Sequence, residues 1–478
     1  MISRYISLPR LLLGFNTRYT THCYETEASS FEDEEISYIL PDRPIFKGIE
    51  RSVPASAFSR VWNFAVLGGS LVGGTFSSAL QSGFSGSVKD FALSDANIER
   101  VTEGLLRMRG AALKIGQFLS FQEEGKMPPS LIKAMERTRR EAYIMPGAQL
   151  ERVLNKELGT EWQSIFDEFD MMPFAAASIG QVHKAKYKGQ DVAVKVQYPG
   201  VDISIDSDLN NLQRLFQWGR VLPRELFFDE LVKHTRDDLY NECNYLLEAE
   251  HQNRFRELLA NNQEFYIPKA YTEISTKHVL VTEFLDSYLL EEFARVAPQK
   301  LKDSVGTRIL EITIREIFEF NYMQTDPNPA NFQYDFNKDQ LHLLDFGATR
   351  SYDREFIEKY RKVVVAGVEQ DRENSIYWSD QIGYFNGDED PEMFEAHVRS
   401  IYAVGEPLRH PGIYDFGNQK ITNKIYEQLP ALLKYRKSPP PPETYSLHRK
   451  LSGAYLLCMK LKAKVPSNDL YKKYIKTN

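Results

Sequence analysis

The sequence predicts an α+β fold with two lobes, a small lobe rich in strands and a larger lobe that is mainly helical. The small lobe is indicated by Asp191–Val196, where valines alternate with other residues in the period of a half-buried strand. The larger lobe is indicated by the helix-like segment Arg354–Gly367 and the amphipathic stretch Tyr445–Lys462. A chain of 478 residues, 42% of them apolar, is long enough for about two or three structural units.

These patterns divide the chain into five segments. We expect a transit peptide over residues 1–30 and a linker with a candidate transmembrane segment over 31–94. A helical extension over 95–160 precedes the small lobe at 161–283, and the helical lobe occupies 284–478.

Charge and cysteine content exclude two broad classes of protein. The chain has 59 basic and 66 acidic residues and a net charge of −7, so the electrostatic attraction that nucleic-acid binders use is missing and no nucleic-acid partner is expected. The three cysteines Cys23, Cys243 and Cys458 are widely separated and form no CxxC pair. This spacing fits neither a disulfide framework nor a zinc site and indicates idle thiols in a reducing compartment.

The N-terminus has the composition of a mitochondrial transit peptide. Residues 1–24 contain Arg4, Arg10 and Arg18, several Ser and Thr residues, and no acidic residue before Glu25. A basic, hydroxyl-rich and acid-free segment is typical of import sequences. The alternative is an ordinary N-terminal tail.

A stretch without charge follows between Arg60 and Lys89. It spans residues 61–88, and its most apolar part, Phe64–Leu80, would be about 25 Å long as a helix, close to the lower limit for crossing a bilayer. Gly69 and Gly73 form a GxxxG pair that would allow a homodimer of membrane helices. Three interpretations remain open: a dimerising span, an interfacial segment, and a flexible Gly/Ser linker.

The first nucleotide-binding signal is an alanine-rich loop before a strand that ends in a lysine. The loop aligns with the G-x-G-x-x-G-x-V loop of kinases, and Lys195 aligns with the lysine of V-A-I-K. Alanine stands where the first two glycines are expected, so we expect a stiffer loop with an altered nucleotide preference. The predicted nucleotide-binding residues are Ala175, Ala176, Ala177, Ser178, Gly180, Val182 and Lys195.

The second signal is a pair of motifs in the C-terminal half. Asp326 and Asn331 have the D-x-x-x-x-N spacing of a kinase catalytic loop, and Asp345 begins a D-F-G triplet. In this order with Lys195 upstream, the motifs predict a kinase-type nucleotide site. Lys195 is expected to hold phosphates, Asn331 and Asp345 to bind Mg²⁺, and Asp326 to orient the attacking hydroxyl or water.

Lys195 also requires a carboxylate partner on a following helix. The helical segment Glu230–Leu259 contains several acidic residues, and their spacing alone does not select one. The candidates are Asp237, Asp238, Glu242, Glu248 and Glu250.

The chain resembles the UbiB-type atypical kinases of coenzyme Q (ubiquinone) biosynthesis, and most closely the mitochondrial ADCK-like members. The resemblance covers about residues 95–465. It depends on the K-x-G-Q motif within Arg109–Gln117, the AAASIGQVH loop, MQTDPNPANF at Met323–Phe332, LDFGATR after Leu343, and PPETYSLHRK ending at Lys450.

This resemblance implies an atypical protein-kinase-like fold whose N-terminal helical extension packs on the nucleotide site. It implies ATP or ADP and Mg²⁺ as cofactors, selects Glu242 as the partner of Lys195, and gives catalytic roles to Lys114 and Gln117 of the K-x-G-Q motif. The chain departs from the family's E-x-D motif, because Asn244 replaces the aspartate. Any metal or Lys114 contact made there is therefore expected to be weaker.

The expected function is an atypical kinase-like ATPase that supports coenzyme Q biosynthesis at the matrix side of the mitochondrial inner membrane. No A-P-E motif follows the D-F-G triplet, which argues against a platform for peptide substrates. The resemblance implies membrane lipids, coenzyme Q intermediates and other biosynthetic proteins as partners. The alternatives are a non-catalytic nucleotide-sensing scaffold and a protein or small-molecule kinase.

Overall fold

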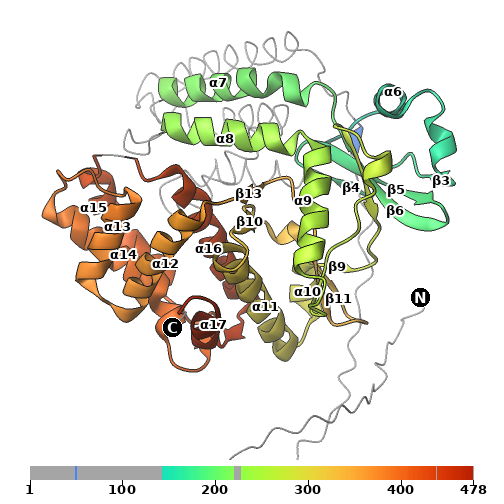
Figure 1. The fold of residues 1–478 in the computed structure, drawn as a ribbon. Coiled ribbons are helices and arrows are strands. Elements are labelled where there is room, and N and C mark those ends of the chain that lie inside the picture. The colour runs from blue at the N-terminus through green and yellow to red at the C-terminus, as the bar shows by residue number, and fades with distance from the viewer. Residues whose placement is uncertain (1–48, 51–142, 220–227, 438, 477–478) are drawn as a thin grey trace, which may run out of the picture.

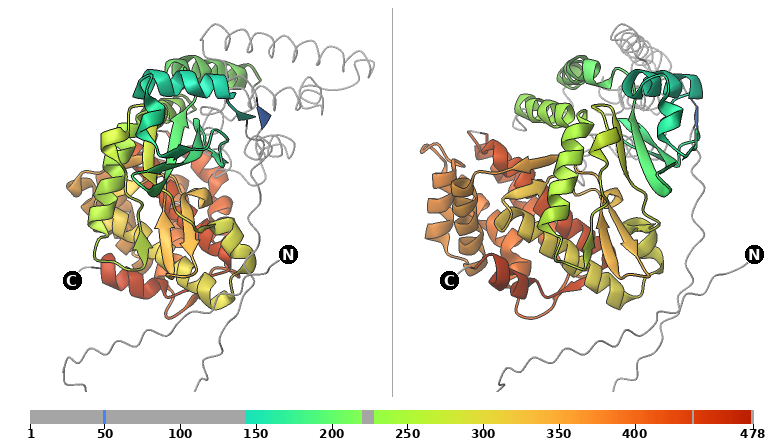
Figure 2. Two further views of the ribbon diagram at one scale, coloured as in Figure 1. Left: turned by 90° about the vertical axis from the view of Figure 1, so that its right-hand side faces the viewer. Right: turned by 45° about the vertical axis from the view of Figure 1, so that its right-hand side comes forward.

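The computed structural model describes residues 49–50, 143–219, 228–437 and 439–476. Within these ranges the chain forms two lobes: Figure 1 shows the strands β4–β6 beside α6, and the helices α11–α17 gathered in the other lobe. In Figure 2 the teal and green elements lie above the orange and red ones. The predicted α+β fold is confirmed. The transit peptide, the segment 61–88 and residues 95–142 of the extension lie outside the described residues.

The small lobe contains an antiparallel sheet with the order β3-β5-β6-β8, and β4 pairs with β5 at its edge. Valines of β6 point into the lobe's core, and Lys195 points to the other face, because side chains alternate along a strand. Helix α6 (Gly147–Leu158) covers the sheet with two fully buried leucines. The strands are β3 (Glu168–Phe169), β4 (Ala175–Ala176), β5 (Gly180–Tyr187), β6 (Gln190–Gln197) and β8 (Val279–Glu283).

Three helices follow β6: α7 (Val201–Gly219), α8 (Phe228–Glu242) and α9 (Tyr245–Leu258). The sequence predicts one helical segment where the structure has α8 and α9. The interruption lies at Asn244, which has φ −109° and accepts a hydrogen bond from the backbone N of Leu247 at 3.5 Å. Asn244 is therefore the N-cap of α9. Because Asn and Asp cap helices equally well, this position tolerates the loss of charge.

Helix α9 belongs to the hydrophobic cores of both lobes. Its N-terminal residues Tyr245 and Ala249 pack in the core of the small lobe. Its C-terminal residue Phe255, with the following Leu259, packs in the core of the helical lobe. Helix α9 thus connects the two hydrophobic cores and packs against both lobes.

The helical lobe carries two short antiparallel pairings that hold the predicted catalytic segments. β10 pairs with β13, and β11 and β12 form the centre of a sheet with the order β7-β12-β11-β9. The strands are β7 (Phe265–Tyr266), β9 (Tyr288–Leu289), β10 (Tyr322–Gln324), β11 (Phe332–Asp335), β12 (Gln340–Leu343), β13 (Thr349–Ser351), β14 (Tyr414–Asp415) and β15 (Lys464–Val465). The helices are α10 (Leu290–Val296), α11 (Gln299–Phe318), α12 (Arg354–Glu369), α13 (Arg372–Ile382), α14 (Pro391–Arg409), α15 (Ile421–Tyr435), α16 (Pro442–Leu461) and α17 (Ser467–Tyr474).

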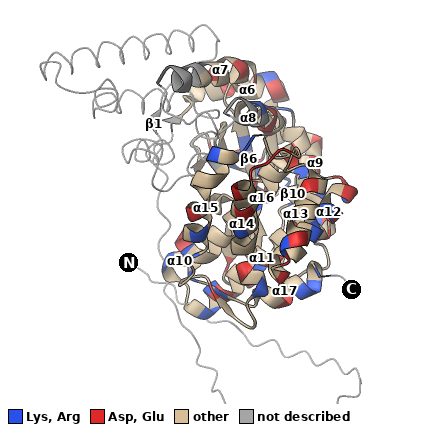
Figure 3. Ribbon diagram, turned by 90° about the vertical axis from the view of Figure 1, so that its left-hand side faces the viewer, with Lys and Arg blue, Asp and Glu red and all other residues tan. Residues whose placement is uncertain are grey.

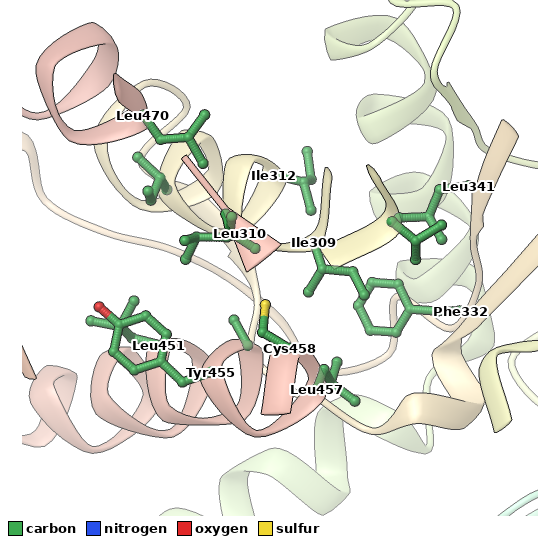
Figure 4. Close-up of a cluster of buried hydrophobic side chains, with 14 of the residues drawn as sticks. Ile309, Leu310, Ile312, Phe332, Leu341, Leu451, Tyr455, Leu457, Cys458 and Leu470 are labelled. Carbon is green, nitrogen blue, oxygen red and sulfur yellow. The ribbon is translucent and has the colours of Figure 1, made fainter. Parts of the chain in front are cut away.

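The core of the helical lobe forms where α11 packs against α16. Figure 4 shows Cys458 of α16 opposite Ile309 and Leu310 of α11, and all three side chains are fully buried. Burial raises the pKa of Cys243, the other described cysteine, to about 12. Both thiols are free and buried, and their lack of a chemical role stays a prediction.

The surface shows charges of both signs, and on the face drawn in Figure 3 Lys and Arg are interspersed with Asp and Glu. Within the described ranges, no helix has the length and apolar character that a bilayer crossing requires.

Stability should fall with acidification because a histidine is buried without charge. Burial lowers the pKa of His397 to about 3, and its Nε2 lies 2.9 Å from Ser379 Oγ. Between pH 6.5 and 3 the unfolded chain binds a proton that the folded chain excludes, so this contribution is complete above pH 6.5 and is lost as the pH falls. We expect His397→Gln to flatten the pH dependence of the free energy of unfolding by up to about 1.4 kcal/mol per pH unit.

Urea unfolding of wild type and His397→Gln at several pH values from 7.5 to 4.5 measures this slope. Parallel curves for the two proteins would contradict the assignment.

Candidate active site

A cavity of about 390 Å³ brings most of the predicted site residues together. It is lined by the alanine-rich loop and β6 on one side and by the D-x-x-x-x-N and D-F-G segments on the other. Gly180 is not among its lining residues, and Lys114 and Gln117 lie outside the described part of the chain. The predicted residues that line it are Ala175, Ala176, Ala177, Ser178, Val182, Lys195, Glu242, Asp326, Asn331 and Asp345.

The alanine-rich loop is a tight hairpin. Ala175 pairs with Val182, and the backbone N of Ala177 donates to the carbonyl of Gly180 at 2.8 Å. A Cβ at Gly180 would lie 2.6 Å from the carbonyl oxygen of Val196 and 2.9 Å from Tyr245 Oη. Glycine is therefore required here by close packing between β5 and its neighbours, and a contact of Gly180 with the nucleotide stays a prediction.

Lys195 pairs with Glu248 of α9. Its Nζ lies 2.8 Å and 3.0 Å from the two carboxylate oxygens of Glu248 and 3.4 Å from Asp345 Oδ2. The expectation that Glu242 is the partner is therefore wrong. Glu242 is the last residue of α8 and lines the same cavity, so its separate role in the site stays a prediction.

The pairing with Glu242 came from the resemblance, whereas the structure turns Glu248 of α9 toward Lys195. Tyr245, Glu248, Gln252 and Phe255 lie on one face of α9 at helical spacing, and all four are buried. Glu250 of the same helix is exposed. The helical period of the buried residues continues from Glu242 through Tyr245 to Glu248, so it includes both glutamates and selects neither.

One ammonium group faces two carboxylates in this cluster. Burial lowers the pKa of Lys195, but attraction to Asp345 and Glu248 outweighs that effect, so the pKa lies well above its ordinary value. Burial raises the pKa of Glu248 to about 7, and Lys195 offsets this only in part because the charge of Asp345 opposes it. The cluster therefore holds a charged lysine beside an excess of negative charge, which favours cations at Asp345.

The D-F-G segment is held by its backbone and by its aromatic ring. Asp345 has φ +47°, a left-handed conformation that aspartate adopts more readily than most residues and that often marks functional sites. The ring of Phe346 is buried 4.9 Å from that of Phe255 on α9. The same helix thus carries Glu248 and packs against the segment that carries Asp345.

Asn331 and Asp345 present the oxygen ligands that Mg²⁺ prefers. Asn331 Nδ2 donates to the carbonyl of Asp326 at 3.1 Å, so its Oδ1 is directed away from that bond and available as a neutral ligand. The Asp345 carboxylate adds a charged one. This donor set fits the predicted metal site and explains why the amide and the aspartate loop are five residues apart.

Gln324 joins the two segments predicted to be catalytic, and it is not among the site residues predicted from the sequence. Its side chain accepts from the backbone N of Asp326 at 3.1 Å and donates to the carbonyl of Asp345 at 3.2 Å. Behind it, Lys450 of α16 lies 3.4 Å from Gln324 Oε1 and forms an ion pair of 2.7 Å with Glu316 of α11. The catalytic segments are thus anchored to a buried ion pair of the helical lobe.

Helix α16 also holds the catalytic loop directly. Arg449 donates to the carbonyl of Thr325 at 3.0 Å and to its hydroxyl at 2.9 Å, and its guanidinium reaches Asp238 of α8 at 3.5 Å. A Cβ at Gly453 would lie 2.2 Å from the ring of Pro327, so only glycine allows this approach. The residues Arg449–Gly453 therefore support Asp326 from behind.

The two lobes, the lysine–glutamate pair and the Asp–Asn–Asp set define a kinase-like nucleotide-binding protein. The model of the ABC1 atypical kinase-like domain matches residues 137–377. This chain therefore belongs to the ABC1 atypical kinase-like family, and the predicted UbiB-type resemblance is confirmed.

Curated relatives resemble the chain over most of its length. It is 42% identical over 430 residues to "Atypical kinase COQ8, mitochondrial" of Schizosaccharomyces pombe, covering 89% of this chain and 70% of the relative. It is 41% identical over 431 residues to the protein of the same name in Saccharomyces cerevisiae, with coverages of 88% and 85%. It is 40% identical over 428 residues to "Atypical kinase COQ8B, mitochondrial" of Rattus norvegicus, with coverages of 88% and 81%.

The fold also resembles a solved structure, the complex of Rv3197 with erythromycin from Mycobacterium tuberculosis. The TM-score is 0.55 at 23% identity, and the match covers 79% of this chain and 95% of the other. At this identity the likeness supports the fold alone.

Proposed function

We propose that this chain is a mitochondrial, Mg²⁺- and ATP-dependent atypical kinase-like ATPase that supports coenzyme Q biosynthesis. The observation that carries the proposal is the single cavity in which Lys195, Asp326, Asn331 and Asp345 converge below the alanine-rich loop. A protein that only bound nucleotide would have no use for the carboxylate of Asp326, which lines the cavity beside the metal-binding pair.

Each group has a role that phosphoryl transfer requires. Lys195, fixed by Glu248, would hold the phosphates, and Asn331 Oδ1 with the Asp345 carboxylate would hold Mg²⁺. When bound, Mg²⁺ supplies positive charge that offsets the charge of the phosphates. The carboxylate of Asp326 would accept the proton of an attacking hydroxyl or water, and Gln324 fixes the backbone position from which that carboxylate extends.

The segment after the D-F-G triplet supports water or a small acceptor rather than a peptide. From Gly347 the chain enters β13 and then α12, which begins at Arg354 and is capped by Asp353. This leaves no long activation segment between Gly347 and Arg354 on which a peptide could lie.

The names of the relatives support the cellular setting. Three of the similar proteins are described as mitochondrial COQ8 or COQ8B kinases. We propose the matrix side of the inner membrane as the site of action, and membrane lipids, coenzyme Q intermediates and other biosynthetic enzymes as partners. Lys114 and Gln117 would act from the N-terminal extension, and Gly69 and Gly73 would mediate a homodimer.

Phosphate release by the full-length protein tests the proposal. We expect Mg-ATP turnover that rises when liposomes and a phenol resembling a coenzyme Q precursor are added. Asp345→Asn should reduce phosphate release to the level of a reaction without enzyme. The substitution removes the charged metal ligand, while asparagine still tolerates the left-handed backbone. Asp380→Asn, on the exposed side of α13, is the matched control and should behave like wild type.

Each alternative gives a different result. Nucleotide binding without phosphate release above the Asp345→Asn blank would contradict the ATPase and favour the scaffold. Labelling of added peptides with radioactive phosphate would contradict the small-acceptor assignment and favour a protein kinase.

A further inference from the structure

Gln333 is a further amide side chain that lines the cavity. Gln333 lies on β11 two residues after Asn331, and both residues line the cavity. The pairing partner of Gln333 on β9, Leu289, also lines the cavity, as do the apolar residues Val182, Ala193 and Leu344. A polar group in apolar surroundings requires a hydrogen-bond partner, so both the oxygen and the nitrogen of this amide require one.

The oxygen end of the amide faces a buried polar chain. Ser287 Oγ donates to Gln333 Oε1 at 2.6 Å, and His342 Nδ1 lies 3.0 Å from the same hydroxyl. The side chains of Ser287 and His342 are both buried. The three residues thus form a continuous chain of hydrogen bonds from the core of the lobe to the cavity.

Two observations fix the direction of this chain. The distance of 2.6 Å fits a hydroxyl bound to an oxygen and is short for an amide nitrogen. In addition, Nε2 of His342 is buried without a hydrogen-bond partner among the described residues, and an unpartnered acceptor costs less than an unpartnered N–H. The single proton of the ring therefore lies on Nδ1. Burial lowers the pKa of His342 to about 4, which keeps the ring neutral at physiological pH.

These hydrogen bonds hold the side-chain amide of Gln333 in one of its two flip orientations. His342 donates to Ser287, Ser287 donates to Gln333 Oε1, and Gln333 Nε2 is left as a donor at the cavity wall. Two residues of extended chain separate Gln333 from Asn331, about 7 Å. The donor is therefore separate from the metal site proposed at Asn331 and lies beside Leu289 of β9, which also lines the cavity. This part of the cavity would hold the nucleoside half of a nucleotide.

We propose that Gln333 is a specificity-determining residue that donates a hydrogen bond from Nε2 to an acceptor atom of the nucleoside. The acceptor is a ribose oxygen or an unprotonated nitrogen of a purine ring, since both have a free lone pair and a ribose hydroxyl can rotate its proton away from the amide. The proposal rests on the nucleotide binding proposed above and adds the group that recognises the nucleoside.

Calorimetric titration of the full-length protein with Mg-ATP and analogues tests the proposal. The analogues are 2′-deoxy-ATP, 3′-deoxy-ATP, 3-deaza-ATP and 7-deaza-ATP, each of which lacks one acceptor. The variants are Gln333→Leu, which suits a strand and removes the donor, Gln333→Glu, which replaces the donor by an acceptor, and Ser287→Ala, which releases the amide. Gln263→Leu, at an exposed position outside the cavity, is the control.

We expect Gln333→Leu to weaken Mg-ATP binding about 5-fold, the effect of one hydrogen bond. Gln333→Glu should weaken it about 10-fold or more, because two acceptors then face each other. Ser287 does not line the cavity, so Ser287→Ala should weaken Mg-ATP binding only about 2- to 3-fold. Gln263→Leu should leave Mg-ATP binding unchanged.

The decisive result is coupling between protein and ligand. One analogue should bind wild type more weakly than ATP does, but should bind Gln333→Leu as tightly as ATP does. The atom missing from that analogue is the acceptor. If every analogue loses the same affinity in wild type and in Gln333→Leu, the inference is overturned while nucleotide binding stands. If wild type binds no nucleotide, the proposed function fails and the inference fails with it.

Discussion

Replacing Lys450 by methionine should destabilise the protein by about 3–5 kcal/mol, because it leaves the carboxylate of Glu316 buried without a counter-charge. The two side chains are each 3% exposed and lie 2.7 Å apart between α16 and α11. Burial raises the pKa of Glu316, and Lys450 is the cation that offsets this effect. Urea unfolding followed by circular dichroism measures the loss.

Two further variants separate the buried charge from ordinary packing. Lys460→Met removes a lysine of the same helix that forms an exposed pair with Glu291, and it should cost less than about 1 kcal/mol. Lys450→Met combined with Glu316→Met should recover most of the stability, because apolar side chains replace such a pair at little cost. A cost for Lys450→Met no larger than that for Lys460→Met would show that the buried pair does not stabilise this lobe.

Replacing Glu248 by glutamine should lower kcat/KM for ATP about 10- to 100-fold, the effect of about 1.5–3 kcal/mol expected for a charge-assisted hydrogen bond. The side chain of Glu248 is 2% exposed, so no water can substitute for its two contacts to Lys195. Without that carboxylate, Asp345 is the one described carboxylate left within ion-pair distance of Lys195. Its oxygen would then be drawn toward the lysine and away from the metal. Steady-state phosphate release measures kcat/KM.

Substitutions of two nearby glutamates, Glu250 and Glu242, are the controls for Glu248→Gln. Glu250→Gln changes an exposed residue of the same helix and should leave kcat/KM within about 2-fold of wild type. Glu242→Gln should leave the reactivity of Lys195 toward acylating ATP analogues unchanged, whereas Glu248→Gln should raise it by lowering the pKa of the ammonium. The opposite pattern for these two variants would restore Glu242 as the partner of Lys195.

The sequence predicts the residues of this site better than it predicts their pairing. Lys195, Asp326, Asn331 and Asp345 are recognisable because each lies in a short motif, and the structure brings all four to one cavity. Glu248 is not recognisable in the same way, because both Glu242 and Glu248 fall on the buried side of the helical segment. The buried positions Glu242, Tyr245 and Glu248 follow one another at helical spacing across the cap Asn244, so periodicity alone does not select between the two glutamates.

Contacts between distant segments are also hidden from the sequence. Lys450 is 126 residues from Gln324, and neither residue belongs to a pattern that names the other. Gln333 is similar, since its orientation depends on Ser287 and His342, which come from different strands and linkers. Such residues have ordinary local sequences, and only the fold shows that they support or line the site.

The position of α9 has a consequence for how the protein unfolds. One end of the helix is part of the core of the small lobe, and the other end is part of the core of the helical lobe. Neither core can open fully without exposing buried residues of the other. The described lobes should therefore melt in one cooperative transition, and a ligand that binds only the cavity should protect the amide protons of both lobes from exchange.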